Sequence, residues 1–169
     1  LQAQLGWIYG QQGREVELLE TGEKALESRR RTLGEKHPMT IDVQQRLADA
    51  YRDHGRYDEA EILYRQVLSL QREVLGESHP STVDTLEEFA DCYALQQRLK
   101  DAVPLLVEAV EANWRAGRVD SKPESKLGVT YAWLSDVESY TTLCQQVLPR
   151  HKRTDDLLVA SFSPITFLL

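Results

Sequence analysis

An all-α fold built from repeated helix pairs is predicted by two features of this 169-residue sequence. The first is a loop that is written twice, as LGEKHPMT over residues 33–40 and as LGESHPST over residues 75–82. The second is that shifting the whole chain by the same 42 residues aligns further columns of similar residues, a property typical of repeat arrays. These columns include Leu5, Leu47 and Phe89; Tyr9, Tyr51 and Tyr93; Leu18, Ala60 and Ala102; Ala25, Val67 and Ala109; and Leu26, Leu68 and Val110.

Each period is predicted to hold two helices with a tight turn between them. Apolar residues follow the i, i+3, i+4, i+7 spacing of a core-facing helix. Gly55 separates the two helices and can close the first one with a positive φ. The residues with helical spacing are Leu47, Ala48 and Tyr51 on the first helix, and Ala60, Leu63, Tyr64, Val67 and Leu68 on the second.

The recurring loop is explained by the need to end one helix and start the next at a fixed angle. Gly34 and Gly76 stand where a C-terminal cap belongs, because glycine adopts a positive φ at little cost. Pro38 and Pro80 stand where the next helix begins, where a missing N–H costs nothing. One pair cannot bury its apolar face alone, so stacked pairs are expected to share a continuous core.

Eight helices follow from these signals. The first two are expected to turn at Gly13, which aligns with Gly55, and Pro104 is expected in the first turn of its helix, where N–H groups lack an intrahelical partner. The stretch over 117–123 lacks the Leu-Gly…His-Pro form, so the last pair is expected to pack at a different angle. The predicted ranges are 1–11, 15–33, 38–53, 57–75, 80–95, 99–116, 123–134 and 137–150.

These elements predict a repeat array over residues 1–153 and an apolar tail over 154–169. The tail is expected to cap the last open face, with the broken end of a longer array as the alternative. Because the chain starts with Leu1, it is expected to be a piece of something longer, and the degenerate ends predict self-association. The repeats are expected at about 1–37, 38–79 and 80–121, with a degenerate copy over 122–153 in which LGVTY resembles the earlier LADAY.

Composition narrows the classes of partner. The net charge of −7 argues against nucleic acid, because phosphate binding needs a cationic surface. No apolar run approaches the roughly 18 residues of a membrane span. The two cysteines, Cys92 and Cys144, are too few for a disulfide framework and are expected to be reduced thiols. We therefore expect a cytoplasmic protein that binds neither nucleic acid nor membrane.

No catalytic, metal or cofactor site is predicted. His37 and His79 lie in separate loops about 10 Å apart by helix-packing distances, which is too far for one metal at ligand distances of about 2 Å. No histidine recurs at a helical neighbour of Cys92, and LGEK lacks the other residues of a phosphate-binding loop. The chain is therefore expected not to be an enzyme, and the histidines are expected to be structural.

The pattern LxxxY…GxYxEAExLYxxVLxxxxxxLGxxHPxT resembles the 42-residue tetratricopeptide repeat of the kinesin light chain type. The resemblance is close over 41–82, good over 83–116, recognisable over 1–40, weak over 117–150 and absent after 153. It implies a right-handed superhelical solenoid of about four antiparallel helix pairs, which binds a protein or peptide and catalyses no reaction. Because this repeat type also occurs as the sensor end of signalling NTPases, the alternative is a regulatory, sensor or self-assembly array of a larger multidomain enzyme.

The resemblance implies that the first helix of each pair lines a concave groove. The columns opposite the packed side change from mixed charge in one repeat to nearly all acidic in the next, which predicts a basic partner segment with one apolar anchor. Members of the family that bind the C-terminal carboxylate of a partner use lysine and asparagine at several of these columns. Binding of a carboxylate terminus is therefore not expected here. The candidate residues are Gln45, Arg46, Asp49, Arg52, Asp53, Asp84, Glu87, Glu88, Asp91 and Leu95.

An alternative reading is that these columns form only the solvated side of each helix. Because none of the candidates lies on the packed face, charge reversal at Glu87 and Glu88 is expected to leave the fold intact.

Overall fold

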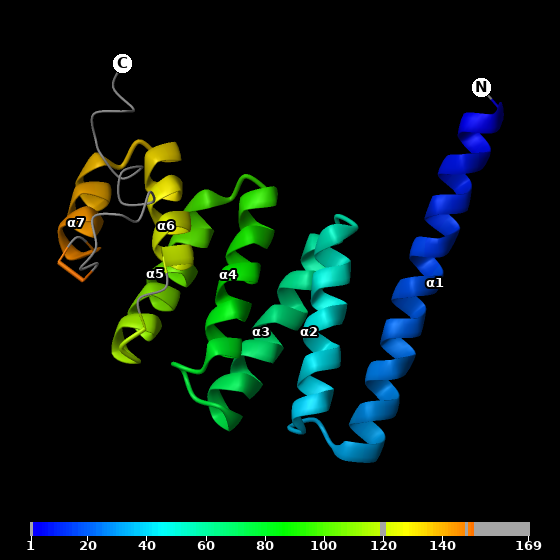
Figure 1. The fold of residues 1–169 in the computed structure, drawn as a ribbon. Helices are drawn as coiled ribbons and strands as arrows, with labels where there is room; N and C mark the ends of the chain where they lie inside the picture. Colours follow the sequence, from blue (N-terminus) through cyan, green and yellow to red (C-terminus); the bar gives the residue numbers. More distant parts are fainter. Residues whose placement is uncertain (1, 119–120, 148, 151–169) are drawn as a thin grey trace. The chain divides into compact units, whose positions relative to one another are not determined.

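The computed structural model of the chain describes residues 2–118, 121–147 and 149–150, with side chains from residue 17 onward except that of residue 121. In this part of the chain all regular structure is α-helical, as predicted (Figure 1). The chain forms two compact units, Leu1–Gly76 and Glu77–Leu169. The helices are α1 (Gln2–Leu33), α2 (Pro38–Asp53), α3 (Tyr57–Val74), α4 (Pro80–Leu95), α5 (Leu99–Arg115), α6 (Ser121–Trp133) and α7 (Val137–Val147). The predicted tail over 154–169 lies outside the described residues.

The first unit consists of α1 packed against the antiparallel pair α2 and α3 (Figure 1). Leu47 and Tyr51 of α2 are buried on the predicted face, and Tyr64 and Val67 of α3 are fully enclosed. The Tyr51 hydroxyl donates a hydrogen bond to Glu23 of α1. Burial of this hydroxyl and its bond to Glu23 raise the pKa of Tyr51 to about 12, so it remains protonated at neutral pH.

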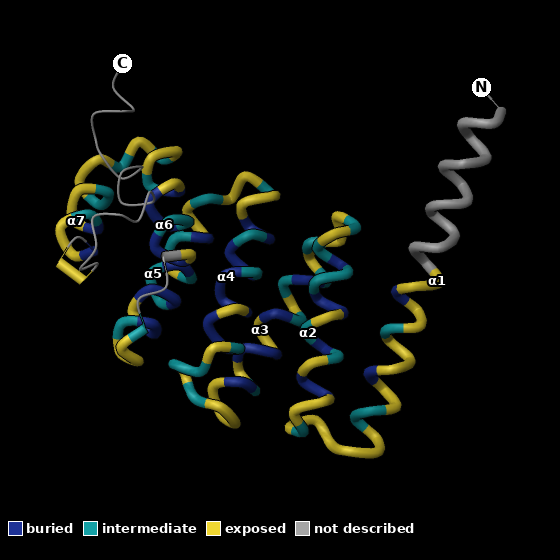
Figure 2. Tube along the Cα trace, viewed as in Figure 1, coloured by how far each residue is buried: buried dark blue, intermediate teal, exposed yellow. Residues whose placement is uncertain are grey.

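In the second unit the pair α4 and α5 packs against the pair α6 and α7, with α5 in contact with α6. Figure 2 shows buried residues, in dark blue, on all four helices. Leu86 and Phe89 of α4 are enclosed, and the rings of Phe89 and Tyr93 stack with centroids 4.8 Å apart. Leu106 of α5 and Leu127 of α6 are also buried in this core. The core-facing spacing read from the sequence is therefore confirmed in both units.

The two recurring loops end and start helices as predicted. Gly34 and Gly76 have φ values of +88° and +92°. His37 and His79 are the N-cap residues of α2 and α4, and each imidazole Nδ1 accepts a hydrogen bond, from Met39 N and Ser81 N, at 3.2 Å. The histidines are therefore structural caps, since they satisfy backbone donors that a helix start leaves unpaired.

Each loop also forms an ion pair with the end of the second helix that follows it. In the first unit Lys36 of the loop pairs with Glu73 of α3. In the second unit the signs are reversed, because Glu77 of the loop pairs with Arg115 of α5 at 2.8 Å.

The turns inside the pairs share one backbone pattern with different residues. Arg56 N donates a hydrogen bond to the Tyr51 carbonyl at 2.8 Å, and Arg98 N donates one to the Tyr93 carbonyl at 2.9 Å. The guanidinium of Arg56 lies over the ring of Tyr51, and that of Arg98 lies over the ring of Tyr93. In the last pair Asp136 takes this place, and its carboxylate accepts a bond from Ser139 N at 3.0 Å. The degenerate repeat therefore keeps the turn while exchanging a stacked arginine for a capping aspartate.

The turn at Gln97 places a residue other than glycine in the left-handed backbone conformation. Gln97 has a φ of +59° in the column where Gly55 has +74°. We expect Gln97→Gly to raise the free energy of unfolding by about 0.5–1 kcal/mol, because the left-handed conformation costs a side-chain-bearing residue about 1–2 kcal/mol and glycine's greater freedom when unfolded offsets part of that gain. Urea unfolding followed by circular dichroism measures the difference.

The control is Gly55→Ala, where a new Cβ would meet nothing within 4 Å, so any loss reports the backbone conformation alone. A Gln97→Gly variant no more stable than the wild type would contradict the assignment of strain.

Two predictions about helix ends are wrong. The expected turn at Gly13 is absent, since α1 is continuous from residue 2 to residue 33. The surrounding glutamine, arginine and glutamate residues are good helix formers, and a lone glycine costs about 1 kcal/mol within a helix. As a consequence Leu18 and Ala25, whose columns are buried in later repeats, are exposed. Pro104 lies in the second turn of α5 rather than the first, on the exposed side, where water can reach the carbonyl left without a donor.

Candidate functional site

The predicted binding residues form two surfaces, one in each unit. We call Gln45, Arg46, Asp49, Arg52 and Asp53 the α2 face, and Asp84, Glu87, Glu88, Asp91 and Leu95 the α4 face.

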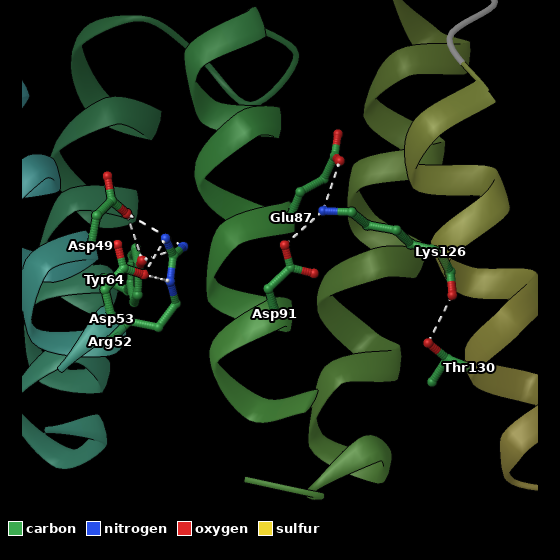
Figure 3. A network of polar contacts seen from close by, with 8 residues as sticks. All are labelled: Asp49, Arg52, Asp53, Tyr64, Glu87, Asp91, Lys126 and Thr130. Atoms are coloured by element: carbon green, nitrogen blue, oxygen red, sulfur yellow. Dashed lines mark hydrogen bonds and ion pairs between the residues drawn. The ribbon is translucent and has the colours of Figure 1, made fainter. Parts of the chain in front are cut away.

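The centre of the α2 face is a hydrogen-bonded network anchored on α3 (Figure 3). The buried Tyr64 hydroxyl donates to Asp49 at 2.6 Å and accepts from Arg52 at 3.0 Å. Arg52 also pairs with Asp53 at 2.9 Å. The two aspartates of this face are therefore occupied by groups of the same unit, and the network is held in place by a side chain from the core.

The other two residues of the α2 face differ in their surroundings. Gln45 is half-buried, and its side-chain carbonyl accepts a bond from the buried Gln71 at 3.1 Å. Arg46 is exposed and pairs with Asp42 one turn earlier at 3.0 Å. An exposed pair of this kind contributes at most about 1 kcal/mol, so Arg46 can exchange its partner easily.

The centre of the α4 face is an ion cluster that involves the next helix pair. Lys126 of α6 lies 3.3 Å from Glu87 and 2.8 Å from Asp91, so one ammonium serves two carboxylates (Figure 3). Burial lowers the pKa of Lys126, but the hydrogen bond to Asp91 and the charges of Asp91 and Glu87 outweigh this and hold it above its usual value. Lys126 is therefore firmly protonated.

The expected exposure of Glu87 is wrong. Its side chain was expected on the solvated side of α4, but the residue is only 6% exposed because α6 packs beside it and supplies Lys126. The expectation that charge reversal at Glu87 leaves the fold intact falls with it. The position of Lys126 could have been found in the sequence, since aligning LGVTY with LADAY places Lys126 in the column of Arg46.

The open part of the α4 face lies at its two ends. Asp84 is exposed near the start of the helix, and Leu95 is 58% exposed at its end. The Asp91 side chain remains 46% exposed despite its bond to Lys126, and Glu88 is half-buried. The face therefore offers carboxylate oxygens along one stretch and an apolar side chain at its end.

Two exposed residues of α6 were missed by the sequence reasoning. Val129 and Trp133 are 57% and 78% exposed, and they stand in the columns of Asp91 and Leu95 when the chain is shifted by 38 residues. The degenerate spacing of the last repeat concealed this equivalence.

A crevice between α5, α6 and α7 has a volume of about 350 Å³ and is lined by residues that include Trp114, Tyr131 and Leu143. A smaller crevice of about 280 Å³ lies in the first unit between α1, α2 and α3, with Tyr51 and Leu63 at the places of Tyr131 and Leu143. Because both units form it at equivalent columns, we assign the crevice to helix stacking rather than to a dedicated ligand site.

In the described part of the chain, no three histidine, cysteine, aspartate or glutamate residues are grouped so as to hold a metal ion. Cys92 is fully buried, and the side-chain amide of Gln96, one turn later, donates a hydrogen bond to the Cys92 carbonyl at 3.1 Å. No helix within the described residues has the length and apolar character needed to cross a membrane.

Comparisons with known proteins find repeats of the tetratricopeptide type both in sequence and in structure. A family model described as tetratricopeptide repeat matches residues 1–73 and 55–113. A solved structure of a putative kinesin light chain from Podosopora anserina with nearly identical TPR-like repeats is 26% identical, with a TM-score of 0.72, and the match covers 94% of this chain and 79% of that one. BtubC (BKLC) from P. vanneervenii is 18% identical with a TM-score of 0.70, covering 86% of this chain and 60% of that one, which shows likeness of fold alone. No curated protein matches the chain in sequence.

Proposed function

Because this chain belongs to the tetratricopeptide repeat family, we propose that it is a non-enzymatic scaffold that binds a basic segment of a protein partner along the first helices of its helix pairs. Likeness to repeats of a putative kinesin light chain supports protein binding as the general role. The chemistry of the α4 face supports the basic character of the segment.

The observation that carries the proposal is the charge of α4. This helix contains four carboxylates, Asp84, Glu87, Glu88 and Asp91, and no lysine or arginine. Lys126 contacts two of the four and balances one negative charge, while Asp84 and part of Asp91 remain open to solvent. A cationic segment would gain charge-assisted hydrogen bonds there, and an anionic one would be repelled.

The α2 face is proposed as a weaker contact. Its carboxylates Asp49 and Asp53 already pair with Arg52, so a basic partner would have to compete with that guanidinium. The α4 face is therefore the proposed site, and the α2 face, taken by itself, is expected to bind a basic segment more weakly.

A selection from random dodecapeptides tests the proposal directly. Peptides displayed on phage and enriched on the immobilised chain are expected to be rich in lysine and arginine. The affinity of an enriched peptide is expected to fall as salt rises from about 50 to 300 mM, because ions screen exposed charges over about 10 Å or less. Enrichment without basic residues, or affinity that is insensitive to salt, would refute the basic-segment proposal.

Matched variants locate the contact. Asp84→Asn/Asp91→Asn is expected to weaken binding several-fold, chiefly by slowing association, because open carboxylates steer a cationic partner. The control Glu73→Gln/Glu111→Gln removes the same charge from exposed positions on α3 and α5 and is expected to bind nearly as well as the wild type. Equal weakening by both variants would mean that net charge, rather than the α4 face, attracts the peptide.

A further inference from the structure

We propose that an apolar patch at the C-terminal ends of α4 and α6 anchors one apolar side chain of the partner segment. The inference rests on the proposed function and adds a second recognition element to it. The apolar patch consists of Ala94, Leu95, Val129, Ala132 and Trp133, all of which are exposed.

The exposure of this patch sets it apart from the surrounding surface. Single exposed apolar residues are common on proteins and need no explanation. Here, however, a tryptophan that is 78% exposed is accompanied by Leu95 and Val129, each more than half exposed. Tryptophan is also among the residues that contribute most to binding at protein interfaces.

The ion cluster fixes the register that brings the patch together. Figure 3 shows α4 and α6 running in the same direction, with Lys126 of α6 level with the stretch between Glu87 and Asp91. Trp133 follows Lys126 by seven residues, or two turns, so it lies on the same side of α6 about 10 Å further along. Leu95 follows Asp91 by about one turn on the corresponding side of α4.

Trp133 and Leu95 therefore reach the same level of two neighbouring helices. The single side chain of Lys126 spans the gap between α4 and α6 to reach Glu87 and Asp91. A partner side chain of similar length, inserted one to two turns further along, can therefore contact both Trp133 and Leu95. Val129 lies one turn before Trp133 and extends the patch toward Asp91.

Charge complementarity indicates what occupies the patch. The apolar side chains adjoin the acidic stretch of α4, where Asp91 is 46% exposed. A leucine, methionine or phenylalanine flanked by lysine or arginine would fit both parts at once. A second copy of the chain is a poor match, because a stable protein interface involves about 20–30 residues on each side and the patch offers five.

An alanine scan of the enriched peptides tests the anchor. We expect one apolar peptide position whose change to alanine lowers affinity for the wild-type chain about tenfold, which corresponds to the burial of one aliphatic side chain. The same change should cost little against Trp133→Ala or Leu95→Ala. Ile62→Ala, at an equally exposed position on α3, should keep the full tenfold dependence, and circular dichroism should show all variants folded.

The two proposals fail separately. If enriched peptides are basic but no apolar position couples to Trp133 or Leu95, the anchor is refuted while the basic-segment function stands. If enriched peptides carry a coupled apolar position but no basic residues, the anchor stands and the charge proposal is refuted.

Fluorine spectroscopy distinguishes other occupants of the patch. With 5-fluorotryptophan incorporated and the Trp133 resonance assigned through Trp133→Phe, the free chain should show a solvent-isotope shift for Trp133 that disappears on peptide addition. A resonance shielded only at high protein concentration would indicate a second copy as the occupant. A resonance shielded at every concentration would indicate that the chain covers the patch itself, and either result overturns the proposal.

Discussion

Replacing Glu87 with lysine is expected to lower the free energy of unfolding of the second unit by about 3 kcal/mol. Glu87 is 6% exposed and lies 3.3 Å from Lys126, so the substitution removes a buried partner and places two ammonium groups together. Removing one member of a buried ion pair typically costs about 3–5 kcal/mol. The lower end applies here, because the Lys126 side chain is 35% exposed and solvent screens part of the repulsion.

The control is Asp84→Lys, which makes the same charge change on an exposed residue of the same helix. It is expected to alter stability by no more than about 0.5 kcal/mol, as surface substitutions usually do. The exchange Glu87→Lys/Lys126→Glu should recover part of the loss. Equal urea midpoints for Glu87→Lys and Asp84→Lys would show that the ion cluster does not hold α4 to α6.

The second large effect is expected from Ala60→Leu, at about 1–3 kcal/mol of lost stability. Ala60 is completely buried near the start of α3, where its small side chain lets α2 and α3 approach closely. Extra methylene groups in a packed core force shifts of neighbouring side chains and backbone. Thermal unfolding monitored by circular dichroism measures the loss.

Ala25→Leu provides the matched comparison, because Ala25 is exposed on α1. Alanine and leucine are both strong helix formers, so this variant should remain within about 0.5 kcal/mol of the wild type. If Ala60→Leu were as stable as Ala25→Leu, close packing at Ala60 would be refuted.

The sequence predicted most of the fold because the helix ends are determined by local chemistry. Pro38 and Pro80 begin α2 and α4, and the glycines before them have the positive φ that ends a helix. The family resemblance read from these repeats is likewise confirmed by the family match over residues 1–73 and 55–113. Where local signals were balanced, as at Gly13, the prediction failed, because good helix formers on both sides let α1 continue.

The candidate site was less predictable, because exposure depends on the neighbouring helix pair. The angular position of Glu87 on its own helix places it opposite Phe89 and Tyr93, yet the residue is buried and pairs with Lys126 of α6. The pairing of Asp49 with Tyr64 likewise requires the contact of α2 with α3. A prediction of exposure from the residue spacing of one helix cannot include contacts with another helix. The exposure of Leu95, at the end of its helix, agrees with the position predicted from that spacing.

The reversed ion pairs of the two loops bear on how such a chain can evolve by duplication. Lys36 meets Glu73 in one module, and Glu77 meets Arg115 in the next. Recombination within a helix pair would join the loop of one module to the second helix of the other, and would set Lys36 against Arg115 or Glu77 against Glu73. Recombination between whole modules keeps each pair complementary. Each of these exposed pairs contributes at most about 1 kcal/mol, so the charges favour, without enforcing, inheritance of a loop and its two helices as one segment.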